Sequence, residues 1–191
     1  MVFVVLLAAV ALVVILFFGG KLDNLLSCRF KHPWLVLVAV VLKIISISGL
    51  HDLLGLPEAV IPFLRVLSLL MAVFFVLLNF SWRGFPLVGL GLLSNTLVIL
   101  LNGGNMPVKE VYTHLAFTGP ELDKLKDGLP VDSFILVSSD TKLSFLGDVL
   151  LMPQWVPLTK LFSIGDVIVT LGGIIFITYY LRKGAGAHFN N

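Results

Sequence analysis

The sequence predicts an all-α membrane protein, a five-helix transmembrane bundle with a small extracytoplasmic segment between the fourth and fifth helices. Of its 191 residues, 58% are hydrophobic and 13% are charged, whereas soluble domains average about 25% charged residues. The apolar residues also gather in long runs, and a helix needs about 20 mostly apolar residues to cross the hydrocarbon core. These runs lie at 1–18, 33–50, 60–80, 86–102 and 162–181.

The domain boundaries follow from these runs. Four transmembrane helices are expected within 1–102, and an extracytoplasmic segment over 103–160. A fifth transmembrane helix is expected over 161–183, followed by a disordered tail over 184–191. The first run is uncharged, and it lacks the basic region that precedes the apolar stretch of a secretory signal peptide. We therefore expect 1–18 to be a retained transmembrane helix.

Prolines and glycines fit the expected helices. The second, third and fourth helices each have a proline near the start, at Pro33, Pro62 and Pro86. Proline is tolerated there because the N–H that it lacks would have no partner within the helix. The fourth and fifth helices contain glycines, which let neighbouring backbones approach closely. These are Gly89, Gly91, Gly165, Gly172 and Gly173.

The basic residues predict the orientation of the helices. They fall in the loops that alternate helices would place on one side of the membrane: Lys21, Arg29, Lys31, Arg83, Arg182 and Lys183. The opposite short loop, 51–58, contains no Lys or Arg. Because cytoplasmic loops carry an excess of basic residues, we expect the N-terminus outside and the C-terminus in the cytoplasm.

The outer segment is too long to be a bare linker, so we expect it to contain structure. Its first part, 102–108, is predicted to be a compact exit from the fourth helix, with glycines in left-handed conformations. Pro107 is suited to begin the next helix. Residues 108–117 are predicted to form a short amphipathic helix that lies against the bilayer surface.

Two further elements are expected in the outer segment. Thr118 and Glu121 match a capping box at the start of a short helix over 121–127. The apolar stretches 131–137 and 142–146 are separated by Ser-Ser-Asp-Thr, a pattern that resembles a β-hairpin.

Polar residues interrupt the later apolar runs at Lys43, Arg65, Asn95 and Asp166. A charged side chain inside a bilayer costs a few kcal/mol, so it has a partner or a function. The predicted orientation brings these residues and Asn102 toward the outer half of the membrane. Pairing of Asp166 with Arg65 or Lys43 would lower the cost of burial. Two interpretations remain open: an interhelical network that fixes packing, or a site for a ligand, ion or proton.

The helical faces on which these residues lie predict which of them are neighbours. Asp166 and Gly173 share one face of the fifth helix, while Gly91, Asn95 and Asn102 share one face of the fourth. We expect these two faces to meet, which would bring Asn95 or Asn102 close to Asp166.

A further acid, Asp148, raises the possibility of an acid–base dyad with Asp166, because paired carboxylates can separate their pKa values. No cofactor or metal ion is expected, since no His, Cys or Asp spacing matches a metal site and no phosphate-binding loop is present. The single cysteine, Cys28, excludes an internal disulfide, and a net charge of +2 gives no indication of nucleic-acid binding.

Three patterns together resemble one known family: Asn102-Gly-Gly-Asn-Met-Pro-Val108, Asp140-Thr-Lys-Leu-Ser-Phe-Leu-Gly-Asp148 and Phe162-Ser-Ile-Gly-Asp-Val167. The family is a group of small bacterial multi-pass membrane proteins classed as a domain of unknown function. This resemblance implies a location in the bacterial inner membrane. It implies no activity, substrate or catalytic residue.

The leading functional hypothesis is a non-catalytic binding or assembly protein. Its site would consist of Asp166, Arg65, Lys43, Asn95, Asn102 and Asp148, and it would accept a lipid head group, a small solute or a partner protein. The bilayer is the expected environment, and a homo-oligomer is possible. One alternative is a membrane-embedded enzyme that acts on a lipid-linked substrate through Asp148 or Asp166. Another is a small transporter, although five spans leave little room for inverted repeats.

Overall fold

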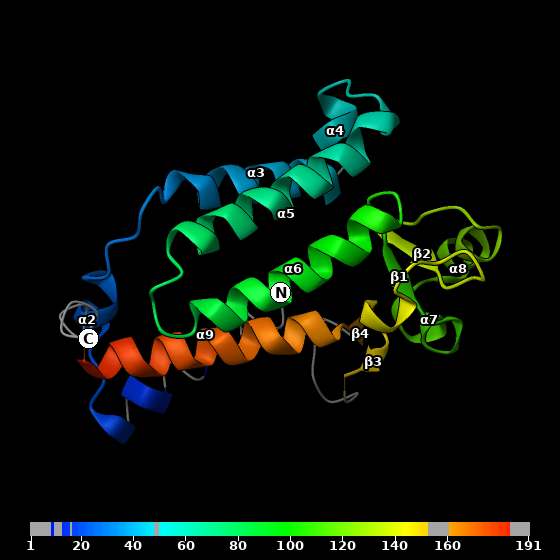
Figure 1. Cartoon of the computed structure of the whole chain (residues 1–191). Coiled ribbons are helices and arrows are strands. Elements are labelled where there is room, and N and C mark those ends of the chain that lie inside the picture. The colour runs from blue at the N-terminus through cyan, green and yellow to red at the C-terminus, as the bar shows by residue number, and fades with distance from the viewer. Residues whose placement is uncertain (1–8, 10–12, 16, 48–49, 153–160, 184–191) are drawn as a thin grey trace.

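The computed structural model describes residues 9, 13–15, 17–47, 50–152 and 161–183. Its main feature is a row of long helices in which each packs against the next (Figure 1). In order across the row these are α3 (Trp34–Ile47), α5 (Ile61–Leu78), α6 (Phe85–Leu101) and α9 (Ile164–Lys183). The prediction of a mostly helical protein is therefore confirmed.

The long helices coincide with the second to fifth predicted runs. Among the described residues, two helices are long and apolar enough to cross a membrane: Glu58–Leu78, with 21 residues, and Ile164–Lys183, with 20 residues. The first of these includes the short 3-10 helix η1 (Glu58–Val60) ahead of α5. The apolar helices Trp34–Ser46 and Phe85–Leu101 are shorter. Most of the first predicted run, 1–18, lies outside the described residues.

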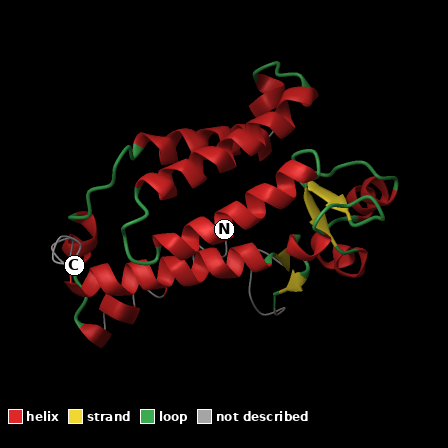
Figure 2. Ribbon diagram, in the orientation of Figure 1, coloured by secondary structure: helices red, strands yellow, loops and turns green. Residues whose placement is uncertain are grey.

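The two ends of the row differ in structure. At one end lie the short helices α7 (Glu110–Ala116) and α8 (Gly119–Lys126) and all the named strands (Figure 2). At the other end, α2 (Leu22–Leu26) packs beside the C-terminal part of α9 (Figure 1). Between α3 and α5, the short helix α4 (Leu50–Leu53) turns the chain toward η1.

An aromatic cluster closes the α2 end. Trp82, Phe85 and Tyr180 are buried there, and the ring centroids of Trp82 and Tyr180 are 4.9 Å apart. Phe30 stacks on Phe85 at 5.6 Å. Asn79, at the end of α5, is bonded to the segment between α2 and α3: its Oδ1 accepts from the Lys31 N–H at 2.8 Å and its Nδ2 donates to the Lys31 carbonyl at 2.9 Å. These contacts hold the loops and the end of α9 together.

Glycines set the close approach of α6 to α9. A Cβ added at Gly91 would lie 2.4 Å from the Gly165 carbonyl oxygen, and one added at Gly165 would lie 2.8 Å from that of Gly91. Seven residues along each chain segment from this contact, Gly84, which has a φ of 93°, meets Gly172 in the same manner. Because any side chain would push the backbones apart, these glycines allow the contact, as the sequence predicts.

The predicted helices of the outer segment are confirmed with small shifts. Helix α7 falls within the range 108–117 but begins at Glu110, so Pro107 does not start it. Pro107 lies instead in strand β1 (Met106–Val108). Helix α8 begins two residues earlier than expected and has the predicted capping box, in which Glu121 accepts from both the N–H and the hydroxyl of Thr118 at 2.7 Å.

The predicted β-hairpin is wrong. Strand β2 (Phe134–Leu136) pairs in parallel with β1, whereas the second half of the expected hairpin forms a 3-10 helix, η2 (Ser144–Leu146). The backbone of Lys142 bonds to the Asn102 side chain instead of a partner strand: its N–H donates to Asn102 Oδ1 at 2.9 Å and its carbonyl accepts from Asn102 Nδ2 at 2.8 Å. A second small sheet pairs β3 (Leu150–Leu151) with β4 (Leu161–Phe162) in antiparallel order.

Candidate functional site

The start of α9 is fixed by a capping box that was not predicted from the sequence. Ser163 Oγ accepts from the N–H of Asp166 at 3.0 Å, and Asp166 Oδ2 accepts from the N–H of Ser163 at 3.0 Å. This reciprocal pair satisfies backbone donors that the first turn of a helix leaves without partners. The Ser-x-x-Asp spacing was the available signal. Part of the role of Asp166 is therefore structural.

Asp166 also joins α9 to α6. Asn95 Nδ2 donates to Asp166 Oδ1 at 2.9 Å, and Asn95 Oδ1 accepts from Ser163 Oγ at 2.9 Å. The contact of Gly91 with Gly165 brings the helices close enough for these short side chains to meet. The predicted meeting of the two helical faces is confirmed, with Asn95 as the residue near Asp166.

A cavity of about 210 Å³ lies beside this network. Five of the six residues predicted from the sequence line it, namely Lys43, Arg65, Asn95, Asp148 and Asp166. The rest of the lining is mainly apolar: Leu69, Ile99, Gly104, Met106, Ser133 and Phe134. The helices α3, α5, α6 and α9 and the outer segment thus all contribute to one cavity.

The expected ion pair of Asp166 with Arg65 or Lys43 is absent from the described part of the chain. Arg65 points to the outer segment instead: one guanidinium nitrogen donates to Asn105 Oδ1 at 2.7 Å and another to the Asp132 carbonyl oxygen. Arg65 is 8% exposed, and its Nε has no hydrogen-bond partner among the described residues. Asp166 needs no cation because Asn95 and Ser163 already donate to both its oxygens.

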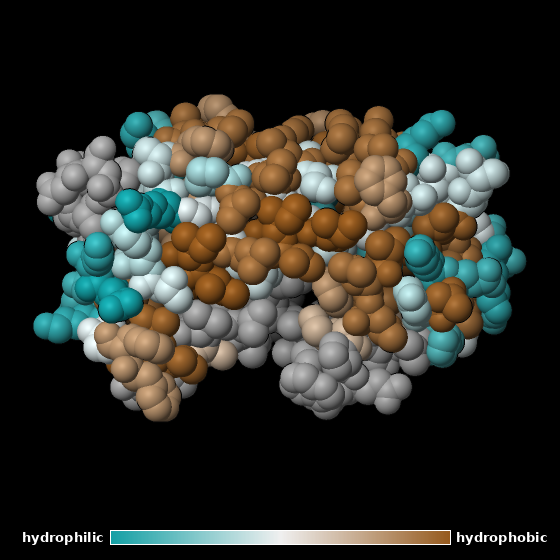
Figure 3. Space-filling view, turned by 60° about the horizontal axis from the view of Figure 1, so that its bottom comes forward, coloured by the Kyte–Doolittle hydropathy of each residue, from teal (hydrophilic) through white to brown (hydrophobic). Residues whose placement is uncertain are grey.

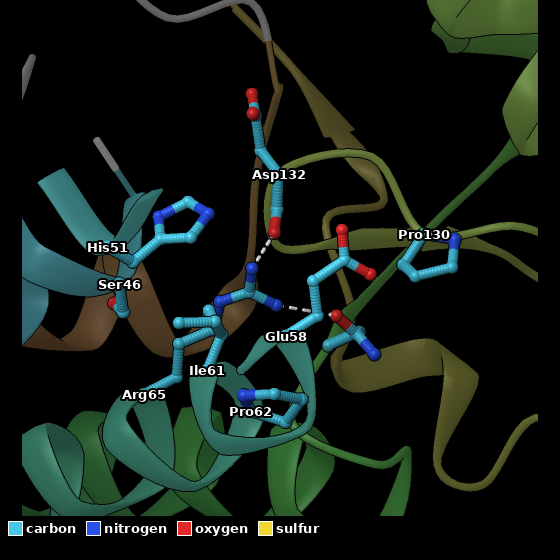
Figure 4. A pocket seen from close by; sticks show the side chains of 9 residues that line it. Ser46, His51, Glu58, Ile61, Pro62, Arg65, Pro130 and Asp132 are labelled. Atoms are coloured by element: carbon cyan, nitrogen blue, oxygen red, sulfur yellow. Dashed lines mark hydrogen bonds between the residues drawn. The ribbon is translucent and has the colours of Figure 1, made fainter. Parts of the chain in front are cut away.

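Arg65 also lines a second pocket of about 300 Å³, here called the outer pocket (Figure 4). Glu58, Asp132 and His51 contribute to its lining, and the Asp132 carboxylate is directed away from the guanidinium. Figure 4 shows the guanidinium directed at the Asp132 carbonyl. Sequence reasoning did not identify Asn105 or Asp132, because neither lies in a helix pattern that points toward Arg65.

Lys43 reaches the cavity from α3. The neighbouring positions Ala39 and Ser46 are buried, which shows that this face of α3 packs against protein. Ser68 Oγ on α5 donates to the Ala39 carbonyl at 2.7 Å and fixes the pair of helices. No hydrogen bond or ion pair of the Lys43 ammonium is found within the described ranges. The ammonium is therefore available to a group inside the cavity.

Asp148 enters from the outer segment. Its backbone N–H donates to the Pro107 carbonyl at 2.8 Å, and it forms a parallel bridge with Val108, so the small sheet positions it at the cavity. Its side chain is 7% exposed, and Oδ1 has no hydrogen-bond partner among the described residues. Burial, followed by the charge of Asp166, raises the pKa of Asp148 from 3.8 to about 7, against the opposing effect of Lys43.

Asn102 is the predicted site residue that does not reach this cavity. Its Nδ2 donates to the Val98 carbonyl at 2.7 Å and to that of Lys142. Asn102 therefore anchors the outer segment to the end of α6. The following residues, Gly103 and Gly104, have φ values of 65° and 84°, which confirms the predicted left-handed exit.

Residues 27–178 match the model of a family of unknown function, DUF5317. The chain belongs to this family. An uncharacterized protein of Thermotoga maritima is 28% identical over 159 residues, which cover 82% of this chain and 80% of the relative. No solved structure matches the chain. The predicted kinship to a domain of unknown function is therefore confirmed, and all lining residues of the cavity fall inside the range matched to DUF5317.

Proposed function

We propose that this protein is a multi-pass inner-membrane protein that binds a small polar ligand or head group in the cavity, without covalent chemistry. The observation that carries the proposal is that two buried atoms of charged groups on the cavity lining, Arg65 Nε and Asp148 Oδ1, lack hydrogen-bond partners among the described residues. Lys43 lines the same cavity and forms no ion pair within the described ranges. Buried polar groups are almost always paired. A network that served only to fix helix packing would pair these charges with each other, whereas a binding site keeps them for its ligand.

The exposed apolar surface supports membrane insertion. In the most apolar 18-residue window of each long candidate helix, only 28% of the residues are buried, whereas the core helix of a soluble protein is mostly buried. Large apolar side chains such as Leu37, Phe74 and Leu93 are exposed along the helices. Figure 3 shows a brown hydrophobic band across the middle of the molecule, with hydrophilic teal at both ends. A bilayer would cover this band.

The basic end supports a cytoplasmic C-terminus. The Lys21 N–H donates to the Leu181 carbonyl at 2.9 Å, and the Arg83 guanidinium lies 4.3 Å from the centre of the Tyr179 ring. These basic residues gather at the end opposite the outer segment, as the positive-inside rule requires for the proposed orientation. The cavity then lies in the outer half of the membrane, under the outer segment.

The orientation has its own test. In a Cys28→Ala background, a cysteine placed at exposed Ser139 should react with a membrane-impermeant maleimide. The reagent is added to cells whose outer membrane has been removed and whose inner membrane is still sealed. A cysteine placed at exposed Arg182 should react only after the cells are opened. The reverse pattern would invert the topology and place the cavity on the cytoplasmic side.

Native mass spectrometry of protein released from its membrane tests the binding function. The wild type should retain one small molecule or lipid, and Lys43→Met should lose most of it. Lys126→Met is the matched control, because Lys126 is exposed on α8 and is not among the residues that line the cavity. Identical bound masses in the wild type and Lys43→Met would exclude the cavity as the binding site.

One observation favours a second candidate function, an enzyme that acts on a lipid-linked substrate. Asp148 has a pKa of about 7, which suits a general acid or base at neutral pH, and Asp166 lines the same cavity. Under this alternative, purified protein would turn over a lipid-linked substrate, and Asp148→Asn would abolish turnover while the fold stays intact. Retention of an unchanged ligand by the wild type supports the binding function instead.

A further inference from the structure

We propose that the ligand is a zwitterion that joins a primary ammonium group to a phosphate or carboxylate, such as a phosphoethanolamine head group. This inference rests on the proposed binding function and specifies its ligand class. The cavity presents groups of both signs: the buried donor Arg65 Nε and the buried acceptor Asp148 Oδ1 have no hydrogen-bond partner among the described residues, and the ammonium-bearing Lys43 lines the same cavity.

The charge balance selects against simpler ligands. An inorganic anion would pair with Lys43 and Arg65 but would also face Asp148 and Asp166, which line the same cavity. A simple cation would meet the two basic side chains. Like charges brought together at a partly buried site repel more strongly than in bulk water, because the surrounding protein lowers the effective dielectric constant. A ligand that carries both charges satisfies both sides and leaves the net charge of the cavity unchanged.

The hydrogen-bonding groups of the cavity restrict the class of ligand further. Both oxygens of Asp166 already accept hydrogen bonds, from Asn95 Nδ2 and the Ser163 N–H. Asp148 Oδ1 is therefore the principal acceptor left for a ligand. It requires an N–H donor, which a primary ammonium has and a quaternary ammonium lacks. On the opposite side, an anionic oxygen would accept from Lys43 and Arg65 in charge-assisted hydrogen bonds.

The size of the cavity fits a head group. Its volume is about 210 Å³, and one liquid water occupies about 30 Å³, so the space corresponds to about seven waters. This accommodates a phosphate or carboxylate and an amine joined by two carbons, but not an acyl chain. The same chemistry occurs in a soluble zwitterion and in the head group of an ethanolamine lipid, so the experiment must separate the two sources.

Thermal shift and calorimetric binding of the purified protein in neutral detergent, at about pH 8, test the inference. The probes are glycerophosphoethanolamine, glycerophosphocholine, glycerol 3-phosphate and ethanolamine. Glycerophosphoethanolamine should bind about tenfold or more tightly than each of the others, because only it supplies an N–H donor together with an anion. Asp148→Asn should remove this preference, and Asp140→Asn, a change at an exposed turn carboxylate, should keep it.

Nanodiscs of phosphatidylglycerol with either phosphatidylethanolamine or phosphatidylcholine identify the source. Stabilisation by the ethanolamine lipid without binding of the soluble probe assigns the site to a lipid head group and supports the inference. Equal binding of glycerol 3-phosphate and glycerophosphoethanolamine by the wild type would overturn the zwitterion and leave the binding function in place. A wild type that responds to none of the probes or lipids, and retains no molecule from its membrane, would overturn both.

Discussion

Replacement of Asp148 by asparagine is expected to stabilise the ligand-free protein. Asp148 is 7% exposed, and its Oδ1 has no hydrogen-bond partner within the described residues. Its pKa in the folded protein is about 7, against 3.8 when unperturbed. Between these values the unfolded chain loses its proton while the folded protein keeps it. Stability therefore falls as the pH rises through this window and is lowest above about pH 7.

The pKa difference sets the size of the effect. A change from 3.8 to about 7 corresponds to about 4 kcal/mol of destabilisation once the group is ionised in both states. Asparagine has nearly the same shape but carries no charge, so Asp148→Asn removes this penalty. We expect the gain in unfolding free energy to rise from less than about 1 kcal/mol near pH 4 to about 4 kcal/mol near pH 8.

Denaturant unfolding in detergent micelles, followed by tryptophan fluorescence at several pH values, measures this gain. The matched control is Asp140→Asn, because Asp140 is an exposed carboxylate in the same outer segment and should give little change at any pH. A variant that is less stable than the wild type at every pH would refute the reasoning. That result would mean that the Asp148 carboxylate is held by favourable structural contacts.

Three further predictions concern binding and packing. Binding of glycerophosphoethanolamine should weaken about tenfold from about pH 8 to about pH 6, because Asp148, with a pKa of about 7, becomes protonated. Calorimetry across this range measures the affinity, and an affinity that does not change with pH would contradict the prediction. Gly165→Ala should lower the unfolding free energy by about 1–3 kcal/mol or more, since the new Cβ would lie 2.0 Å from Asn95 Oδ1. Gly119→Ala, with no atom within 4 Å of the added Cβ, is its control, and equal losses in the two variants would contradict the close-packing argument. Thr118→Ala should destabilise α8 by about 1 kcal/mol, seen as faster hydrogen exchange in that helix alone; unchanged exchange there would show that the capping box contributes nothing.

The long helices, and the proximity of several polar residues on them, could be predicted because each inference rests on a local pattern. Apolar runs of membrane length gave α3, α5, α6 and α9, and periodicity put Asn95 and Asp166 on faces that meet. Because burying a charge costs free energy, Lys43 and Arg65 were expected to belong to a polar cluster, and both line the cavity. These inferences required only the spacing of residues within one helix and the direction of the chain.

The outer segment could not be predicted as well, because its contacts are long-range. The parallel pairing of β1 with β2 joins residues far apart in sequence, and no local signal distinguishes it from a hairpin. The position of Asp148 above the cavity depends on the same sheet. Asp166 was expected to pair with Arg65 or Lys43, but hydrogen bonds from Ser163 and Asn95 satisfy its carboxylate instead.

The most direct test is an experimental structure of the protein purified in its native lipids. The account predicts a molecule between Lys43 and Asp148, with its anionic oxygen in reach of Lys43 Nζ and its nitrogen in reach of Asp148 Oδ1. A direct ion pair between Lys43 and Asp148 that closes the cavity would contradict the account and assign these charges to packing.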